Sequence, residues 1–488
     1  MFNIKPLLIS ITLTTVIAST IAFDTKANNQ NNKNKLPEIG IAGFSVLSLD
    51  KEHQIGNAMM RELRASQPLI HDPVLTEYIN HLGNQLVKNA QDVNYPFEFF
   101  LIKNNELNAF AFFGGHVGIH SGLLTTADNE SELASVIAHE ISHVTQRHLA
   151  RRLESQSNTQ SLGMAGMVSG ILLSLVNPSL GMAALSASMA ASQQASINYT
   201  RSNEKEADSV GIALLANSNF DPQGTPSFFS KMSEKYRYAS KPPAMLLTHP
   251  LPESRIADAR QRAHRYPVKH LAPSLNFELA KARIQARYQN NAKEHIAFFQ
   301  QQLKRQSYSL QEGAKYGLAL SYFEHGEYIK AKEILESLKE KDTNNLFYVD
   351  ALTDVYIALK LFDSAISMLT DLSLLMPNNR VISLNLGNAL EKSKRYDEAI
   401  VVLQDFLLVS PENFLAYDML TTIYQKQKNK GLMHVNKAEV YALLGIYNKA
   451  IDELQTSYNF VEEQPLLQKR IKARILQFQE QQNKLKRL

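Results

Sequence analysis

Residues 128–143 of the chain read DNESELASVIAHEISH. This stretch predicts a long helix with Asp128 as its N-cap, because an Asp side chain accepts hydrogen bonds from the free N–H groups of a first turn. Glu130 and Glu132 follow in that turn, where carboxylates complement the positive end of the helix dipole. The helix then carries the run His139-Glu140-Ile141-Ser142-His143.

Two histidines four positions apart on a helix point in nearly the same direction, so His139 and His143 can bind one ion. Glu140 lies on the next flank, where it can reach a water bound to that ion. Zinc would lower the pKa of the water, and Glu140 would take its proton and pass it to the leaving amine of a cleaved peptide. The motif therefore predicts one Zn2+ per chain and a peptide hydrolase. The alternative, a helix that contains two histidines by chance, is weak because such a run is expected in only about 2% of sequences of this kind.

A third ligand is predicted downstream, since a catalytic zinc needs three protein ligands and one open position. Residues 201–208 read RSNEKEAD, at the start of a predicted helix around 203–216. Glu204 and Asp208 are again four apart, and we expect Glu204 to bind the metal and Asp208 to hydrogen-bond a ligand histidine. Glu206 is rotated by about 200° from Glu204 and is predicted to face solvent.

The first residues predict an export signal over 1–27. An apolar stretch runs from 7 to 23, and small residues near Ala22 and Ala27 offer cleavage sites. An uncleaved anchor is the alternative, but the stretch is only about 15 to 17 residues long, which is short for a membrane span. The polar run 28–35 follows it directly.

Composition bounds the remaining possibilities. The chain has no cysteine, which excludes disulfides, a lipid-modified N-terminal Cys, thiolate ligands and a Cys nucleophile. Its net charge of +4, from 51 Lys+Arg and 47 Asp+Glu, gives no case for a nucleic-acid partner. A length of 488 residues predicts two or three domains.

The predicted fold class is α+β and mostly helical. A zincin-like metallopeptidase domain is predicted over 44–266, with helices up to about residue 90 and two or three strands within 97–102 and 110–123. A Pro-rich stretch near 267–273 marks the boundary to a second domain, an α-solenoid over 275–488.

The second domain is predicted from an internal repeat. Ala331, Ala365 and Ala399 are spaced by 34 residues, the period of tetratricopeptide helix pairs. Other positions keep the same period: Tyr322 and Tyr356; Leu335, Leu369 and Leu403; Pro377 and Pro411. The register fails at Met433 and resumes at Ala450, so the fourth unit is either irregular or contains an inserted half-repeat.

Residues 161–196, rich in Gly, Ala, Ser, Met and Leu, allow two interpretations. Asn177-Pro178 divides them into halves of roughly 15 residues, and neither half can cross a bilayer as a helix. They could form a mobile helical pair that covers the cleft or contacts a membrane surface. They could equally form a buried helical hairpin packed by small residues.

Residues 108–113 form either an edge strand on which a substrate backbone docks or a plain core strand. His116 and His120 alternate on a predicted strand without a third ligand nearby, and we expect them to be ordinary polar residues. The same is expected of four further histidines: His53, His71, His81 and His148.

Several of these residues together resemble the HtpX and CAAX-prenyl-protease superfamily of zinc peptidases. The resemblance rests on His139-Glu140-x-x-His143, Asn203-Glu204-x-Glu206-Ala207-Asp208, Thr248-His249-Pro250 with Arg255, Asn108-Ala109-Phe110-Ala111, Gly114-Gly115 and Ser121-Gly122-Leu123-Leu124. With the export signal and the repeats, the chain is similar to the β-barrel assembly-enhancing proteases of Gram-negative bacteria. The similarity is strong over 100–260 and looser in the repeats.

The resemblance implies that His139, His143 and Glu204 bind zinc and that Glu140 is the catalytic base. It also implies a periplasmic protein, soluble or peripherally associated with the outer membrane. Its partners would be unfolded or stalled outer-membrane proteins and the β-barrel assembly machinery, and its role would be to promote barrel assembly and to degrade barrels that stall.

His249 lies in the Pro-rich loop 242–252, and the resemblance favours a function for it over a bond to backbone. It could be a fourth ligand that closes the open zinc position at rest, so that movement of its loop would switch the enzyme on. It could instead donate a hydrogen bond to the oxyanion of the tetrahedral intermediate. Both roles remain open.

Two functions of different classes follow. The first is an endopeptidase whose repeats hold it near its substrates. The second is a chaperone or adaptor in which the repeats bind partners and the metal mainly stabilises the fold. Glu140 favours the first, because a structural zinc has no use for a base.

Overall fold

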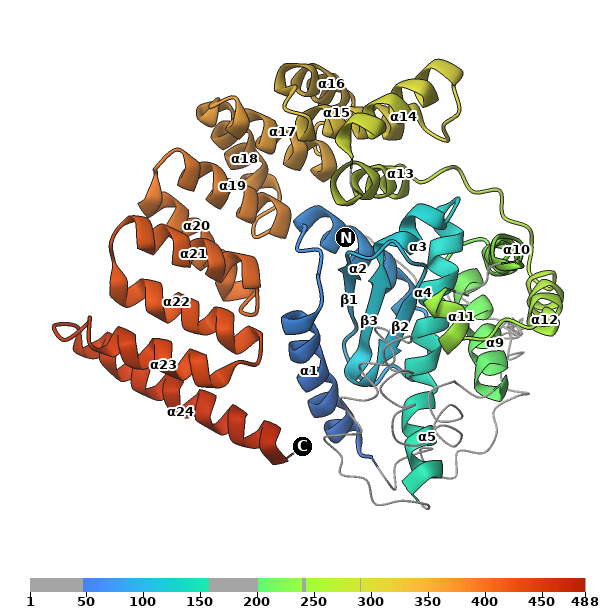
Figure 1. The fold of residues 1–488 in the computed structure, drawn as a ribbon, viewed down its shortest axis with the longest axis horizontal. Coiled ribbons are helices and arrows are strands. Elements are labelled where there is room, and N and C mark those ends of the chain that lie inside the picture. The colour runs from blue at the N-terminus through green and yellow to red at the C-terminus, as the bar shows by residue number, and fades with distance from the viewer. Residues whose placement is uncertain (1–46, 158–200, 239–242, 290, 488) are drawn as a thin grey trace, which may run out of the picture. The chain divides into compact units, whose positions relative to one another are not determined.

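A computed structural model describes residues 47–157, 201–238, 243–289 and 291–487 of the chain (Figure 1). The predicted export signal 1–27 and the segment 161–196 lie outside these residues. Among the described helices, none combines the length and the apolar character that a bilayer span requires.

The first part of the chain is mixed helix and strand, as predicted. Its elements are α1 (Leu49–Ser66), α2 (Pro73–Val87), β1 (Glu98–Ile102), β2 (Ala109–Phe112), the 3-10 turn η1 (Phe113–Gly115), β3 (His116–His120), α3 (Ser121–Thr126), α4 (Glu130–Thr145), α5 (His148–Ser157), α9 (Arg201–Asn217), α10 (Gly224–Tyr236), α11 (Ala244–Thr248) and α12 (Glu253–Ala263). The α+β, mostly helical class is thereby confirmed.

The three strands form one small sheet in the order β1-β3-β2, with β1 parallel and β2 antiparallel to β3. Successive side chains of a strand point to opposite faces. Phe110 and Phe112 of β2 therefore pack toward α1, whereas Ala109 and Ala111 pack in the core that contains α2 and α4. The small alanine side chains let α4 lie close against β2.

Helix α4 begins one residue later than predicted. Its N-cap is Asn129, whose side chain accepts a hydrogen bond from the Glu132 N–H, so the prediction of Asp128 as the N-cap is wrong. The Glu132 carboxylate accepts the Asp128 N–H in return, at 2.8 Å. The arrangement is close to a capping box, but the Glu132 carboxylate bonds the N–H of the residue before the N-cap; it satisfies two N–H groups at once.

The other end of α4 is set by Arg147, whose φ of 51° breaks the helix. The Arg147 guanidinium is buried and pairs with Glu52 of α1, and it donates a hydrogen bond to the Leu47 carbonyl at 2.8 Å. These contacts hold the left-handed backbone in place, which a non-glycine residue adopts only at a cost. The chain turns here and continues as α5.

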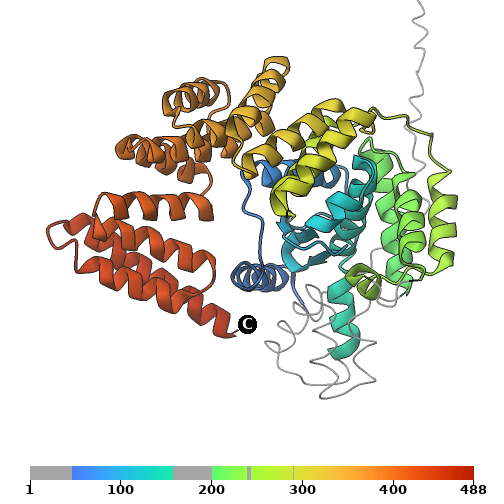
Figure 2. The same cartoon turned by 45° about the horizontal axis from the view of Figure 1, so that its top comes forward.

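The second part is a succession of helices, each beside its predecessor (Figures 1 and 2). Its elements are α13 (Leu275–Arg283) with the π-helical turn η2 (Ile284–Tyr288), α14 (Ala292–Arg305), α15 (Gln311–Glu324), α16 (Tyr328–Lys341), α17 (Leu346–Ala358), α18 (Phe362–Leu375), α19 (Arg380–Lys392), α20 (Tyr396–Val409), α21 (Phe414–Lys426), α22 (Lys430–Leu443), α23 (Tyr447–Tyr458) and α24 (Pro465–Arg487). The predicted repeat of helix pairs is confirmed.

The repeated alanines have a packing role. Ala331, Ala365 and Ala399 lie in α16, α18 and α20, and all three are fully buried. At the irregular fourth unit, α22 is a complete helix between α21 and α23, beginning at Lys430. The 17 residues from Met433 to Ala450 correspond to one additional helix and its connecting loop. This supports the interpretation that half a repeat is inserted here.

One hydrophobic core joins the two parts. It contains Leu75 of α2, Ile137 of α4, Phe277 of α13 and Tyr348 of α17. The domain boundary between residues 266 and 275 therefore remains a prediction. Residues on both sides of it belong to the same hydrophobic core.

Candidate metal centre

Helix α4 brings two imidazoles together in the interior of the molecule. His139 and His143 lie one turn apart, both are buried, and their Nε2 atoms are 3.0 Å apart. Each of these two nitrogen atoms can bind a metal ion when it carries no proton. The structure therefore places the two histidines as the motif predicts.

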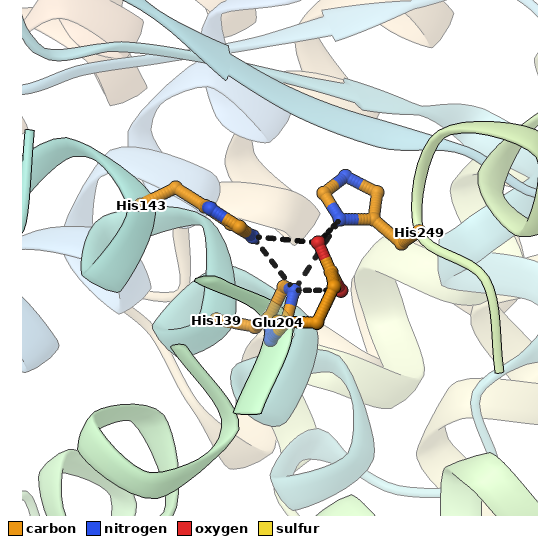
Figure 3. A group of neighbouring side chains, drawn as sticks. All are labelled: His139, His143, Glu204 and His249. Atoms are coloured by element: carbon orange, nitrogen blue, oxygen red, sulfur yellow. Dashed lines mark hydrogen bonds and ion pairs between the residues drawn. The ribbon is translucent and has the colours of Figure 1, made fainter. Parts of the chain in front are cut away.

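Glu204 reaches the same point from α9 (Figure 3). Its Oε2 lies 3.4 Å from the His139 Nε2, and its Oε1 lies 3.5 Å from the His143 Nε2. Helix α9 can come this close because Gly211 faces the α4 backbone, where an added Cβ would lie 3.3 Å from the His139 amide nitrogen. Glu204 itself is buried.

His249 follows the short helix α11 and completes the group. Its Nδ1 lies 3.0 Å from the Glu204 Oε1 and 3.4 Å from the His139 Nε2. Its ring is buried, and its Nε2 is 3.6 Å from the Glu140 Oε1. The structure thus brings His249 to the place of a fourth donor and next to the predicted base.

The spacing of these donor atoms suits one ion. His139, His143, Glu204 and His249 each offer one atom, and all four atoms lie within 4.8 Å of one another. Ligands about 2.1 Å from a tetrahedral ion are separated by about 3.4 Å. The closest pairs of these side-chain atoms, 3.0 to 3.5 Å apart, match that geometry. Three imidazoles and one carboxylate are also the ligand types that zinc accepts.

The local charges favour a cation. Burial by itself would lower the pKa of His139, but Asp208 and Glu204 raise it to about 10 through hydrogen bonds and their negative charge. The same carboxylates would stabilise a metal ion. The pKa of His143 shifts the other way, since burial and the neighbouring His139 hold it well below its usual value. His143 is therefore neutral, which is the form that binds metals.

Glu140 is fully buried beside the group. Burial raises the pKa of its carboxyl group above the usual value. A carboxylate with a raised pKa is a better proton acceptor near neutral pH. Its Oε1 lies 3.6 Å from the His249 Nε2, and the carboxylate is not one of the four donors.

Asp208 orients His139. Its Oδ1 lies 3.0 Å from the His139 Nδ1, on the side of the ring away from the Nε2. Arg255 donates to both Asp208 oxygens at 2.8 Å, and although burial would raise the pKa of Asp208, the hydrogen bonds from His139 and Arg255 hold it low. Asp208 is therefore an ionised acceptor, as the sequence predicts.

Arg255 is the residue whose role the sequence reasoning missed. Its guanidinium also lies 2.7 Å from the Glu204 Oε2 and donates to the Pro250 carbonyl at 2.7 Å. It joins α9 to the loop that carries His249. In the sequence, Arg255 was singled out only as part of the motif that resembles the peptidase family. Its contacts with Glu204 and Asp208 could not be predicted, because its helix α12 is far from 204–208 along the chain.

Of two predictions about polar residues near the site, the one for His148 is wrong and the one for Glu206 holds in part, since the Glu206 side chain is 36% exposed. Glu206 does not face solvent alone: its Oε2 lies 3.1 Å from the His148 Nε2 and accepts a hydrogen bond from Arg151 at 2.8 Å. His148 is not an ordinary polar residue, since its Nδ1 lies 2.7 Å from the His143 Nδ1. The Glu206 prediction considered only the rotation about its own helix, whereas the break at Arg147 returns the chain toward α9 and brings His148 and Arg151 to Glu206.

The other histidines lie in different surroundings. His116 pairs with Glu98 at 3.0 Å, and His71 stacks on Phe414 of α21. Burial lowers the pKa of His120 to about 4. Within the described residues, the group on α4, α9 and the His249 loop is the one set that could hold an ion.

Strand β2 is at the edge of the sheet on the side of α4. All four of its side chains are buried, so it belongs to the core as well as to the edge. Whether a substrate strand adds to it remains a prediction.

The profile described as Peptidase family M48 matches residues 73–263, which include all four donors and Glu140. The beta-barrel assembly-enhancing protease of Yersinia pestis is 41% identical over 440 residues, which cover 90% of this chain and 90% of the relative.

Two proteins of Escherichia coli strain K12 are also similar. Its beta-barrel assembly-enhancing protease is 40% identical over 472 residues, covering 97% of each chain. Its metalloprotease LoiP is 32% identical over 192 residues, covering 38% of this chain and 69% of the relative.

Proposed function

Because this chain belongs to the family of the beta-barrel assembly-enhancing proteases and is a metalloprotease, we propose that it is a zinc-dependent endopeptidase of the periplasm. The observation that carries the proposal is the convergence of His139, His143 and Glu204 on one point, with Glu140 beside it.

His139, His143 and Glu204 would hold the ion, in the His2Glu combination that catalytic zinc sites use. When bound, zinc supplies a Lewis acid that lowers the pKa of a water and polarises the scissile carbonyl. The chain's own residues then set the geometry. Asp208 fixes the His139 ring, and Arg255 fixes Asp208 and Glu204.

Glu140 would move the proton. It accepts the proton of the attacking water as the peptide carbonyl becomes tetrahedral, and it returns that proton to the leaving amine. Its burial supports this role, since the raised pKa of the carboxyl group suits both acceptance and return near neutral pH. A metal with a purely structural role would not need this carboxyl group.

His249 supports either of two roles. Its Nδ1 is close enough to Glu204 and His139 to serve as a fourth ligand at rest. Its Nε2, 3.6 Å from the Glu140 Oε1, supports the second role, donation of a hydrogen bond to an oxyanion. In the first role, displacement of its loop activates the enzyme.

The substrates we propose are unfolded or stalled outer-membrane β-barrel proteins. The names of the relatives carry this proposal, together with the helical repeats, which belong to a class of extended binding surfaces. Repeats that bind a substrate, or the assembly machinery itself, would raise its effective concentration at the site.

Replacement of Glu140 with Gln tests the enzymatic function. Zinc binding should remain, and cleavage of an unfolded outer-membrane β-barrel protein should fall by about 10²- to 10⁴-fold. Bound zinc is measured on the purified chain, and cleavage is followed by gel electrophoresis. Undiminished cleavage would exclude the proposed mechanism, and zinc binding without cleavage by the unmodified chain would favour the adaptor.

A further inference from the structure

His143 is supported differently from His139. The His139 Nδ1 meets the Asp208 carboxylate directly, at 3.0 Å. The His143 Nδ1 meets another imidazole, that of His148, at 2.7 Å. The far nitrogen of His148 then meets the Glu206 carboxylate at 3.1 Å. Each ligand histidine thus leads to an acidic side chain of α9, one directly and one through an intervening ring.

The proton positions along this second path follow from metal binding. A histidine that binds a metal through Nε2 carries its proton on Nδ1. The Nε2 of His143 faces His139 and Glu204, so its Nδ1 must be the donor to His148. The His148 Nδ1 is then the acceptor, and its own proton lies on Nε2, where it points at Glu206.

The acidic end of the path is itself held in place. Arg151 of α5 donates to the Glu206 Oε2 at 2.8 Å, as Arg255 does to Asp208. The His148 side chain has no exposed surface, so the ring cannot be replaced by solvent at this position. Both paths therefore end in an arginine-bound carboxylate, although the sequence places their members on different helices.

From this geometry we infer that His148 and Glu206 are positioning residues for the metal: they fix the tautomer and the ring orientation of His143 so that its Nε2 faces the ion. Hydrogen-bond partners behind a ligand histidine typically change metal affinity by 10- to 100-fold when they are removed. The inference rests on the proposed function, because it assumes that His143 binds zinc.

Replacement of His148 with Phe removes the acceptor and keeps a ring of similar size. We expect the zinc dissociation constant to rise by about 10- to 100-fold, measured by competition with a chromophoric chelator on the full chain. His148→Asn keeps an acceptor near the Nδ1 position and should recover most of the affinity. Glu206→Gln leaves the ring in place and should cause a smaller loss than His148→Phe.

His120→Phe is the matched control, because His120 is equally buried and lies outside the group of donors. It should leave zinc affinity unchanged. A purely structural role of His148 would lower the unfolding temperature of the metal-free and zinc-bound chains equally. The positioning role predicts instead that zinc raises the unfolding temperature less in His148→Phe than in the unmodified chain.

Zinc affinity within twofold of the unmodified chain in His148→Phe, with an unchanged thermal shift, would overturn the inference. Equal affinities of His148→Phe and His148→Asn, both weakened, would overturn it as well, since the restored acceptor would then be without effect. An unmodified chain that binds no zinc would instead contradict the proposed function. The two failures are therefore distinguishable.

Discussion

Two of the clusters of buried charge among the described residues, the metal centre and the group around Arg283, are built in opposite ways. In the metal centre, atoms that can serve as metal ligands face one another: the Nε2 atoms of His139 and His143 and the Glu204 carboxylate lie within 3.5 Å. In the other cluster, Arg283 of α13 lies between Asp72 of α2 and Asp350 of α17 and donates to each of them.

Donors and acceptors are matched in the Arg283 cluster. The Asp72 Oδ1 accepts the N–H groups of the first turn of α2, and its Oδ2 accepts from Arg283 and Tyr288. The second oxygen of Asp350 accepts from Asn385 at 2.8 Å. Such a cluster is complete without a ligand and fastens the repeats to the peptidase part, whereas convergent acceptors need a cation.

The largest effect should come from breaking the matched cluster. Arg283→Met leaves two buried carboxylates without their partner, and removal of one member of a buried pair typically costs about 3 to 5 kcal/mol. We expect a loss of this size in the free energy of unfolding by denaturant, with zinc affinity unchanged. A similar loss of zinc affinity would show that the two clusters are coupled.

Arg395→Met is the control for this substitution. Arg395 pairs with Glu398 on the surface of α20, and its side chain is 42% exposed. Surface pairs contribute little to stability. The free energy of unfolding of this control should equal that of the unmodified chain. An equal loss in both variants would show that the change from Arg to Met itself lowers stability, whether or not the charge is buried.

A smaller effect should follow from Asp208→Asn in the metal centre. Loss of the negative charge weakens the hold on His139, and the zinc dissociation constant should rise by about 10- to 100-fold. The measurement is the chelator competition described for His148. A zinc affinity within twofold of that of the unmodified chain would show that Asp208 does not contribute to zinc binding.

The smallest effect concerns stability within the site's own helix. Asn129→Ala removes the N-cap of α4 and should cost about 1 kcal/mol of unfolding free energy. Zinc affinity should not change, because the cap lies more than two turns before His139. Asp128→Ala is the control and should be nearly neutral. A larger loss of unfolding free energy in Asp128→Ala than in Asn129→Ala would show that Asp128 is the N-cap.

Prediction from the sequence was most successful for features that depend on the spacing of residues within one element. His139 and His143 point the same way because both lie on one regular helix, and Glu204 and Asp208 obey the same rule on α9. The 34-residue period correctly predicted the helix pairs of the second part, because each repeated alanine must fit between neighbouring helices. These relations hold within one element and need no knowledge of the rest.

The sequence reasoning failed where the chain bends or where distant segments meet. Five residues along a straight helix turn by about 500°, so His148 would point away from His143. The left-handed Arg147, held by Glu52 of α1, breaks α4 and brings His148 back to the Nδ1 of His143.

The sequence alone therefore determined the metal motif, its two helices and the repeating array. Tertiary structure decided which side chains stand behind the ligands: Arg255 behind Asp208 and Glu204, and Glu206 behind His148. The reason is physical. A helix fixes the direction of its own side chains, but only packing between helices fixes what those side chains meet.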